Sequence, residues 1–333
     1  MGKFYRRLAL LVVLVLGISG AVIYFTVDIH TLANLTLFQP WSLAVAMLFI
    51  GVGLFLDGSR LMHLVHISHE EISLSQAVQV VFGNYFLALL TPGATGGAVA
   101  QMMFLCHAGV PTGKATVLVF VRTVVSILFL ILCMPFIFMH EAHVLPGVSN
   151  SKLMMISFAA FVVILLLIWG ASSKLLGGLV VRLAKRLSPT RRRSLIRMYR
   201  DTRHAVRLLG QSPKAMFLVF LESGLSLICI YAVVPCLLVG LGVYDADWYA
   251  VMGRMIFLNM LLYFTPTPGG SGIAEGGFVL LFSETVPQGM VGIVAVCWRL
   301  IAEYIPFLIG FYYTIKVFGV TFLRKKEESE QSL

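Results

Sequence analysis

Ionisable side chains inside the long apolar runs of this sequence are the first candidates for chemistry. A charge at membrane depth is costly, so such residues pair with one another or mark a binding or proton-transfer site. Seven such residues are taken as candidates: Asp57, Arg60, Arg122, Glu222, Glu275, Arg299 and Glu303. Their spacing separates those that can pair locally from those that need a distant partner.

Two local ion pairs are predicted. Asp57 and Arg60 are three residues apart, and Arg299 and Glu303 are four apart, so each pair lies on one face of a helix. Self-neutralisation is the simplest interpretation of both pairs. For Asp57, pairing with a cationic part of a ligand or coupling to protons is left open. The candidates for charge pairing or coupling are therefore Asp57, Arg60, Glu222 and Glu303.

Arg122 and Glu222 have no oppositely charged neighbour within a helical turn. Arg122 therefore needs a partner from another segment, either a protein carboxylate or the phosphate of a ligand. Glu275 directly follows a glycine-rich break and is a further candidate for pairing a cationic group or coupling to protons.

Two glycine- and proline-rich breaks supply a candidate anion site. Residues 91–97 are T-P-G-A-T-G-G and residues 265–272 are T-P-T-P-G-G-S-G. The helices that begin after them present free N–H groups and a positive dipole end, which favour a phosphate-bearing head group. The candidate ligands of that head group are Arg122, Arg299, Asn84, Gly96, Gly97, Gln101, Asn259, Gly270, Ser271, Gly272 and Glu275. The alternative is that the glycines only permit close helix packing.

Two segments resemble enzyme motifs without completing them. Residues 109–115, G-V-P-T-G-K-A, are one residue short of a P-loop and have alanine where a hydroxyl must hold magnesium. Residues 269–272 have the G-x-S-G pattern of an intramembrane serine protease, but Ser271 needs a histidine base and the last histidine is His204, in a basic run. We therefore expect no enzyme activity and no cofactor.

A metal site is not expected either. Three histidines follow one another at steps of three, which drift around a helix, so an interfacial cluster is favoured over a metal site: His63, His66 and His69. The five cysteines all lie in apolar runs without metal-type spacing, and we expect free thiols.

The composition is that of a membrane protein. Of the 333 residues, 59% are hydrophobic and 12% are charged, which excludes a cytosolic globular enzyme. Two apolar regions, 74–108 and 249–285, are interrupted by the breaks, so each should form two short helices. The predicted fold is an all-α polytopic membrane protein. Its two broken regions form re-entrant helical hairpins in an inverted repeat. Its six full spans are predicted at about 8–27, 41–65, 115–139, 153–172, 215–240 and 290–317.

The distribution of lysine and arginine predicts the orientation. Four gaps between spans contain neither residue: 28–40, 140–151, 241–248 and 284–289. The basic residues fall in the alternate gaps and at both ends, so the positive-inside rule makes both termini cytoplasmic, including the tail 324–333. Region 74–108 then begins and ends on the cytoplasmic side, whereas region 249–285 begins and ends on the outer side. The two regions are therefore inverted relative to each other.

An internal duplication supports this inversion. F-G-N at 82–84 precedes the first break and F-L-N at 257–259 precedes the second. Asn84 to Arg122 is 38 residues, and Asn259 to Arg299 is 40. The repeat units are about 74–139 and 249–317, and inverted repeats whose broken helices meet near the midplane are typical of transporters.

Most of the positive charge lies in one segment. The chain carries 25 basic and 15 acidic residues, a net charge of +10. Residues 174–214 hold twelve basic residues and one acid, which gives +11 and leaves −1 for the rest. This segment is predicted to be a basic amphipathic loop lying on anionic lipid. Docking of an acidic partner is the competing use. Nucleic acid is not expected, because stacking aromatics are nearly absent there.

Two segments carry a resemblance to a known family. Residues 84–116, N-Y-F-L-A-L-L-T-P-G-A-T-G-G-A-V-A-Q-M-M-F-L-C-H-A-G-V-P-T-G-K-A-T, and residues 265–278, T-P-T-P-G-G-S-G-I-A-E-G-G-F, resemble the two signature blocks of the lysylphosphatidylglycerol synthase transmembrane, or flippase-like, family. The resemblance implies a multi-pass protein of the bacterial or archaeal inner membrane, related to the lipid-translocating half of aminoacyl-phosphatidylglycerol synthases. Only residues 325–333 follow Arg324, so we expect no soluble aminoacyl-transferase domain and no aminoacylation of lipid.

The expected function is movement of a phospholipid or related anionic amphiphile between leaflets, with the head group held between the two broken hairpins. The alternative is a membrane scaffold whose loop 174–214 recruits a glycosyltransferase or lipid-modifying enzyme. Membrane phospholipids are the expected partners, and a homo-oligomer is left open.

Overall fold

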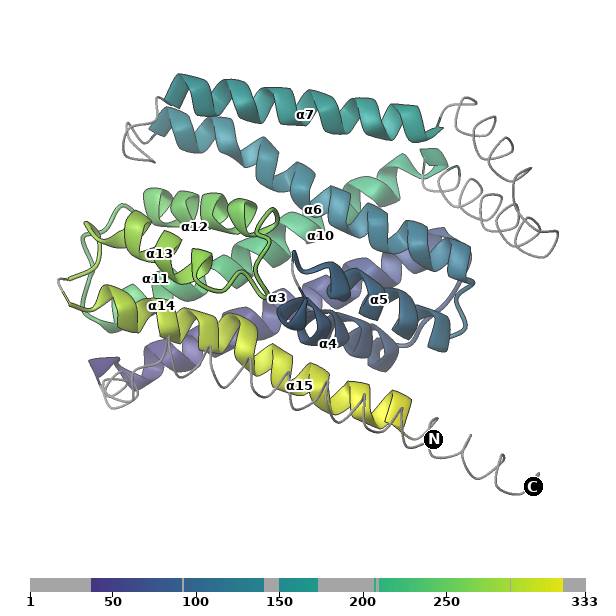
Figure 1. Cartoon of the computed structure of the whole chain (residues 1–333), viewed down its shortest axis with the longest axis horizontal. Helices are drawn as coiled ribbons and strands as arrows, with labels where there is room; N and C mark the ends of the chain where they lie inside the picture. The colour runs from purple at the N-terminus through teal and green to yellow at the C-terminus, as the bar shows by residue number, and fades with distance from the viewer. Residues whose placement is uncertain are drawn as a thin grey trace.

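The computed structural model describes residues 37–91, 93–140, 150–172, 207, 210–287 and 289–319. The predicted first span 8–27, nearly all of the basic loop 174–214 and the tail 324–333 lie outside these residues. The elements in the described part are helices, and the long ones run along the long axis of the molecule (Figure 1).

Four helical segments are long and apolar enough to cross a membrane. They are Pro40–Ile67 (α3), Thr112–His140 (α6), Pro213–Gly240, composed of α10 (Pro213–Tyr231) and α11 (Val233–Gly240), and Val291–Phe318. The last is divided into α14 (Val291–Arg299), the π-helical turn η2 (Leu300–Tyr304), α15 (Ile305–Thr314) and η3 (Ile315–Gly319). They coincide with four of the predicted spans, and α7 (Asn150–Ser172) covers the predicted stretch 153–172 and packs on α6.

Both interrupted regions form two short helices, as predicted. The first contains α4 (Leu74–Leu90) and α5 (Thr95–His107), and the second contains α12 (Trp248–Leu262) and α13 (Ile273–Phe282). The backbone between α4 and α5 turns through Gly93 at a φ of 62°, a left-handed conformation that glycine adopts without strain. The segment before α13 uses Gly269 in the same way, at a φ of 57°.

The first helix of each region begins with a side-chain cap. At α4, the Ser73 hydroxyl accepts from the Gln76 N–H at 3.3 Å and the Gln76 side chain accepts from the Ser73 N–H at 2.8 Å, which is a capping box. At α12, the Asp247 carboxylate accepts from the N–H groups of the second and third residues of the helix, at 3.0 and 3.1 Å. Asp247 also accepts a hydrogen bond from His140, at the end of α6, at 2.7 Å. This bond, followed by the backbone N–H bonds, holds the pKa of Asp247 below its usual value of 3.8.

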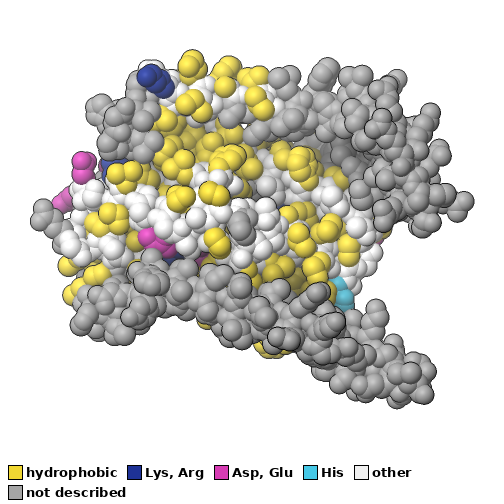
Figure 2. Space-filling view, in the orientation of Figure 1, with side chains coloured by type: hydrophobic (Ala, Val, Ile, Leu, Met, Phe, Trp, Pro, Cys, Tyr) yellow, Lys and Arg dark blue, Asp and Glu magenta, His cyan; other side chains and the backbone are white. Residues whose placement is uncertain are grey.

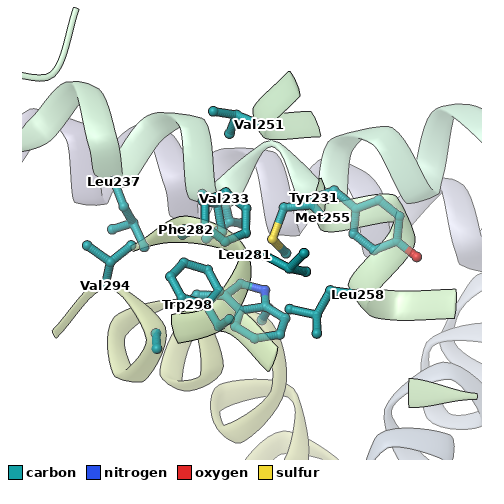
Figure 3. Close-up of a cluster of buried hydrophobic side chains, with 14 of the residues drawn as sticks. Tyr231, Val233, Leu237, Val251, Met255, Leu258, Leu281, Phe282, Val294 and Trp298 are labelled. Atoms are coloured by element: carbon teal, nitrogen blue, oxygen red, sulfur yellow. The ribbon is translucent and has the colours of Figure 1, made fainter. Parts of the chain in front are cut away.

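The helices pack around two hydrophobic cores. Trp298 of α14 lies at the centre of the larger core, with its ring 5.5 Å from that of Phe278, which stacks in turn on Phe282 at 4.4 Å (Figure 3). The smaller core lies between α4, α5 and the ends of α3 and α6 that carry Leu61 and Leu118. Helix α3 packs on α10 and α11, α4 packs on α15, and α12 packs on α6.

The outer surface is apolar over much of the view in Figure 2. Large side chains such as Leu48, Phe136 and Phe217 are 65%, 61% and 62% exposed on the helices of spanning length. A soluble monomer rarely exposes apolar patches of this extent, whereas lipid accommodates them. The charged side chains nearer the middle of these helices are instead buried: Asp57, Arg60, Arg122 and Arg299.

Candidate functional site

The two glycine-rich breaks touch each other at the centre of the molecule (Figure 1). A Cβ atom added to Gly269 would lie 3.2 Å from Cγ of Leu89, and one added to Gly93 would lie 3.7 Å from the carbonyl oxygen of Thr265. Segments predicted to meet, although far apart in the sequence, are therefore adjacent.

The partner of Arg122 is the carboxylate of Asp57 on the neighbouring helix α3. The Nη2 atom of Arg122 donates to Asp57 Oδ2, while Nη2 of Arg60 lies 2.5 Å from Asp57 Oδ1. The three residues are between 4% and 6% exposed. The sequence left two possible partners for Arg122, a protein carboxylate or the phosphate of a ligand. The structure supplies a protein carboxylate. We call Asp57, Arg60 and Arg122 the cationic cluster, because one acid and two bases give it a formal charge of +1.

A polar chain leads from this cluster into the first broken region. Nη1 of Arg122 donates to Oε1 of Gln101 on α5 at 2.6 Å, and Nε2 of Gln101 donates to Oδ1 of Asn84 on α4 at 2.7 Å. The arrangement fixes the orientation of the Gln101 amide. Of the predicted ligand residues, Gln101 thus contacts the arginine directly, and Asn84 is linked to it through Gln101.

Arg299 stands in a second cluster of opposite charge. Its Nε atom lies 3.1 Å from Oε1 of Glu275, and its Nη1 atom donates to Glu303 and, at 2.9 Å, to the carbonyl oxygen of Gly269. The predicted pair of Arg299 with Glu303 is present, and Arg299 is 1% exposed. We call Glu275, Arg299 and Glu303 the anionic cluster, because two acids and one base give it a formal charge of −1.

Helix α4 packs on α3, which carries Asp57 and Arg60, and on α15, which directly follows the turn that carries Glu303. Tyr85 on this helix is within electrostatic range of Asp57 in one cluster and Glu303 in the other. Helix α3, which carries Asp57, also contacts the π-helical turn η2, which carries Glu303. The two clusters therefore belong to one buried polar region around the meeting point of the breaks.

The helix N-termini that were predicted to attract an anion are occupied by the protein's own side chains. The Gly96 N–H at the start of α5 donates to the Thr91 hydroxyl at 2.7 Å, and the Gly272 N–H before α13 donates to Glu275 at 2.7 Å. A Cβ atom on Gly96 would lie 2.6 Å from the carbonyl oxygen of Leu87. Gly96 therefore permits close helix packing, which was the alternative role considered for these glycines. Gly97 does the same, because a Cβ atom there would collide with Asn84.

Other predicted residues of the second region make only local contacts. The Asn259 amide donates to the Met255 carbonyl of its own helix at 2.9 Å, and the Ser271 hydroxyl donates to the Pro268 carbonyl at 2.9 Å. Gly270 has a φ of 69° and forms part of the turn. The two asparagines that correspond in the proposed repeat therefore differ, since only Asn84 contacts the polar chain.

Glu222 on α10 pairs with α3 rather than with either cluster. It accepts from the Ser59 hydroxyl at 3.0 Å, and its Oε2 atom lies 2.8 Å from Nδ1 of His63. Sequence reasoning missed Ser59 as a partner. It also missed Ser126, which accepts from Nη1 of Arg60 at 2.8 Å. A signal for Ser126 was present, because it follows Arg122 by four residues, as Glu303 follows Arg299.

The cationic cluster retains unused hydrogen-bond donors. Among the described residues, no acceptor bonds to Nε of Arg60 or to Nε of Arg122, although both atoms are buried. Buried donors are normally satisfied, and an unsatisfied one marks a site for a water molecule, an ion or a ligand. Nε and Nη2 of Arg299 are likewise buried without a hydrogen-bond partner in the described part of the chain, so it is the excess positive charge that distinguishes the cationic cluster.

Spanning helices with inward-facing charge, joined to two broken helix pairs, define a multi-pass α-helical membrane protein. The chain belongs to the family described as the lysylphosphatidylglycerol synthase TM region, whose profile matches residues 10–310. It is also similar to the UPF0104 membrane protein of Archaeoglobus fulgidus, with 25% identity over 256 residues that cover 72% of this chain and 75% of that protein. The family predicted from residues 84–116 and 265–278 is thus confirmed.

Proposed function

We propose that the protein moves a phospholipid, or a related anionic amphiphile, from one membrane leaflet to the other. The observation that carries this proposal is the cationic cluster: two buried arginines share one aspartate, and the Nε–H of each has no hydrogen-bond partner among the described residues. A phosphate group supplies both the negative charge and the acceptor oxygens that this arrangement lacks. Guanidinium groups bind phosphate with good geometry through paired N–H donors.

The head group would enter where the two breaks touch. Separation of Gly269 from Leu89 would open a path between the broken regions toward Arg122, with Gln101 and Asn84 lining its side. Arg60 and Arg122 would then exchange part of their contact with Asp57 for phosphate oxygens. We leave Arg299 out of the proposed ligand set because its two carboxylate partners give its surroundings an excess negative charge, although its Nη2 atom has no hydrogen-bond partner among the described residues.

An inverted repeat would give such a protein two conformations of equivalent structure, one open to each side of the membrane. The packing supports this arrangement, since the first helix of each proposed unit contacts the last helix of the other: α4 packs on α15 and α12 packs on α6. Rocking of one unit against the other would expose the region between the breaks alternately to each side.

We place the protein in the cytoplasmic membrane with both termini inside. The support is the distribution of lysine and arginine, which are missing from the gaps 140–151 and 241–248 and concentrated on the opposite side. We assign it no enzyme activity. Ser271, the residue of the protease-like pattern, directs its hydroxyl at the Pro268 carbonyl rather than at a base.

Lipid retention by the purified protein tests the proposal. Native mass spectrometry with added phosphatidylglycerol should detect bound lipid on the unmodified protein and much less on Arg60→Gln. This substitution leaves Asp57 paired with Arg122, so no buried charge is stranded. Arg254→Gln is the matched control, because Arg254 donates to the Leu281 carbonyl and the Thr285 hydroxyl, which belong to neither cluster. Equal retention by Arg60→Gln would contradict the proposed head-group site.

A further inference from the structure

The anionic cluster holds more negative charge than its arginine can offset. Arg299 is 1% exposed, and the side chains of Glu275 and Glu303 are 14% and 16% exposed. In the described part of the chain, neither carboxylate forms an ion pair with a second cation. A buried carboxylate without a full counter-charge is expensive and is relieved by a proton or another positive charge.

The surroundings contain few groups that could supply that charge. The charged and titratable groups facing the two carboxylates are Arg299, Tyr304 and, from α4, Tyr85. The Tyr304 ring lies 5.5 Å from Cζ of Arg299 and supplies only a phenol. Helix α3, which carries Asp57 and Arg60, contacts the turn η2 that carries Glu303, so the cationic cluster offers positive charge from a neighbouring helix.

The two clusters are therefore coupled by charge. Their formal charges of +1 and −1 cancel while no ligand is bound. An anionic head group at Arg60 and Arg122 would cancel the +1 and leave the −1 of the anionic cluster unopposed at membrane depth. Charges interact strongly in such a medium, so uptake of one positive charge at the anionic cluster would favour binding of the head group.

Of the two carboxylates, Glu303 is the better proton acceptor by its contacts. Glu275 accepts from the Gly272 N–H at 2.7 Å as well as facing Nε of Arg299, and hydrogen bonds of this kind favour the ionised form. In the part of the chain that the structure describes, the Glu303 carboxylate is hydrogen-bonded only to Arg299. If Glu303 becomes neutral, Arg299 keeps its contacts with Glu275 and with the Gly269 carbonyl.

We propose that Glu303 takes up one proton each time an anionic head group binds at Arg60 and Arg122, so that lipid and proton cross the membrane together. The step converts the Glu303 carboxylate and one solvent proton into a carboxylic acid, with no net charge moved. This inference rests on the proposed lipid-moving function and adds the energy source, a proton gradient.

The test is lipid movement in proteoliposomes under a pH gradient, with a fluorescent phosphatidylglycerol analogue and the membrane potential held at zero by potassium and valinomycin. The analogue should accumulate in the leaflet facing the more alkaline side, approaching about tenfold per pH unit for one proton per lipid. An imposed potential should have no effect on this distribution.

Variants assign the proton to its carboxylate. Glu303→Gln should still move the analogue but should respond to the membrane potential instead of the pH gradient. Glu303→Asp keeps a titratable group and should retain pH-driven accumulation, which guards against a general folding defect. Glu222→Gln, which removes a carboxylate bound to Ser59 and His63, should behave as the unmodified protein does.

Each contrary outcome has a distinct meaning. Lipid movement that ignores the pH gradient, with a phosphatidylethanolamine analogue moving faster than phosphatidylglycerol, would overturn proton uptake in favour of an ammonium group of the lipid itself. Loss of pH-driven accumulation in Glu222→Gln but not in Glu303→Gln would also overturn it. A rate equal to that of protein-free vesicles for both lipids would overturn the proposed function as well.

Discussion

Arg122 of α6 donates to the carboxylate of Asp57 on α3, and no other carboxylate among the described residues contacts this arginine. The contact ties a spanning helix of the first proposed repeat unit to a helix outside both units. It also leaves Arg60 and Arg122 dependent on one shared counter-ion.

Removal of the shared aspartate should destabilise the protein. Asp57→Asn leaves two buried guanidinium groups without a carboxylate, and breaking a buried ion pair in this way costs about 3–5 kcal/mol. The check is the unfolding midpoint in detergent. The double variant Asp57→Asn with Arg60→Gln should recover part of the loss, because one of the stranded charges is removed. Additive losses would show that the two residues do not interact.

The two corresponding asparagines should differ in function. Asn84→Ala removes the acceptor of the Gln101 amide and loosens the group that holds Arg122. Since a hydrogen bond contributes about 0.5–1.5 kcal/mol, lipid movement should slow by roughly two- to tenfold. Asn259→Ala, whose amide bonds only to its own helix, is the matched control and should stay near the unmodified rate. Equal effects would argue against the polar chain.

Glycine at the start of α5 should be needed for packing. Gly96→Ala places a methyl group 2.6 Å from the Leu87 carbonyl oxygen, and overpacking of this kind costs about 1–3 kcal/mol. Gly276→Ala near the start of α13 meets nothing within 4 Å and, as a helical glycine, should be neutral or stabilising by up to about 1 kcal/mol. Unfolding in detergent separates the two, and a Gly96→Ala variant as stable as Gly276→Ala would contradict the packing role.

The cap of α12 should make stability depend on acid pH. The pKa of Asp247 is lowered, chiefly by the hydrogen bond from His140 and then by the N–H of Ala250. A lowered carboxyl pKa stabilises the folded state above the unfolded value near 3.8 and loses that contribution as the pH falls through the folded pKa. Asp247→Asn retains the cap, since asparagine caps equally well, but should remove this dependence.

The measurement for Asp247 is the melting temperature as a function of pH. Above the usual carboxyl pKa the unmodified protein should melt higher than Asp247→Asn, and the difference should shrink in more acidic solution. His140→Ala should reduce the difference by removing the principal cause of the shift. A difference that grows toward acid pH would contradict the assignment.

Local sequence signals were enough for the helices and for part of the site. The apolar runs gave four segments of spanning length, the proline and glycine breaks gave two pairs of short helices, and the spacing of Arg299 and Glu303 gave their ion pair. Each of these depends on residues within a few turns of one another.

The rest of the site depends on contacts between distant segments. Asp57 and Arg122 are 65 residues apart, and no periodicity relates them. The donors of the helix N-termini were expected to be free, but Thr91 and Glu275 fold back on them. The opposite charge of the two clusters could not be predicted from the sequence either. It depends on the distant helix that supplies each counter-ion, α3 for Arg122 and α13 for Arg299.

The central claim, that the cationic cluster holds the head group, is tested most directly by the rate of lipid movement. In proteoliposomes, a fluorescent phosphatidylglycerol analogue is followed by chemical quenching of the outer leaflet. Since a hydrogen bond to a charged group contributes about 1.5–3 kcal/mol, Arg60→Gln and Arg122→Gln should each move the analogue at least about tenfold more slowly than the unmodified protein. Arg254→Gln should stay near the unmodified rate. Rates for Arg60→Gln and Arg122→Gln equal to that of the unmodified protein would contradict the account.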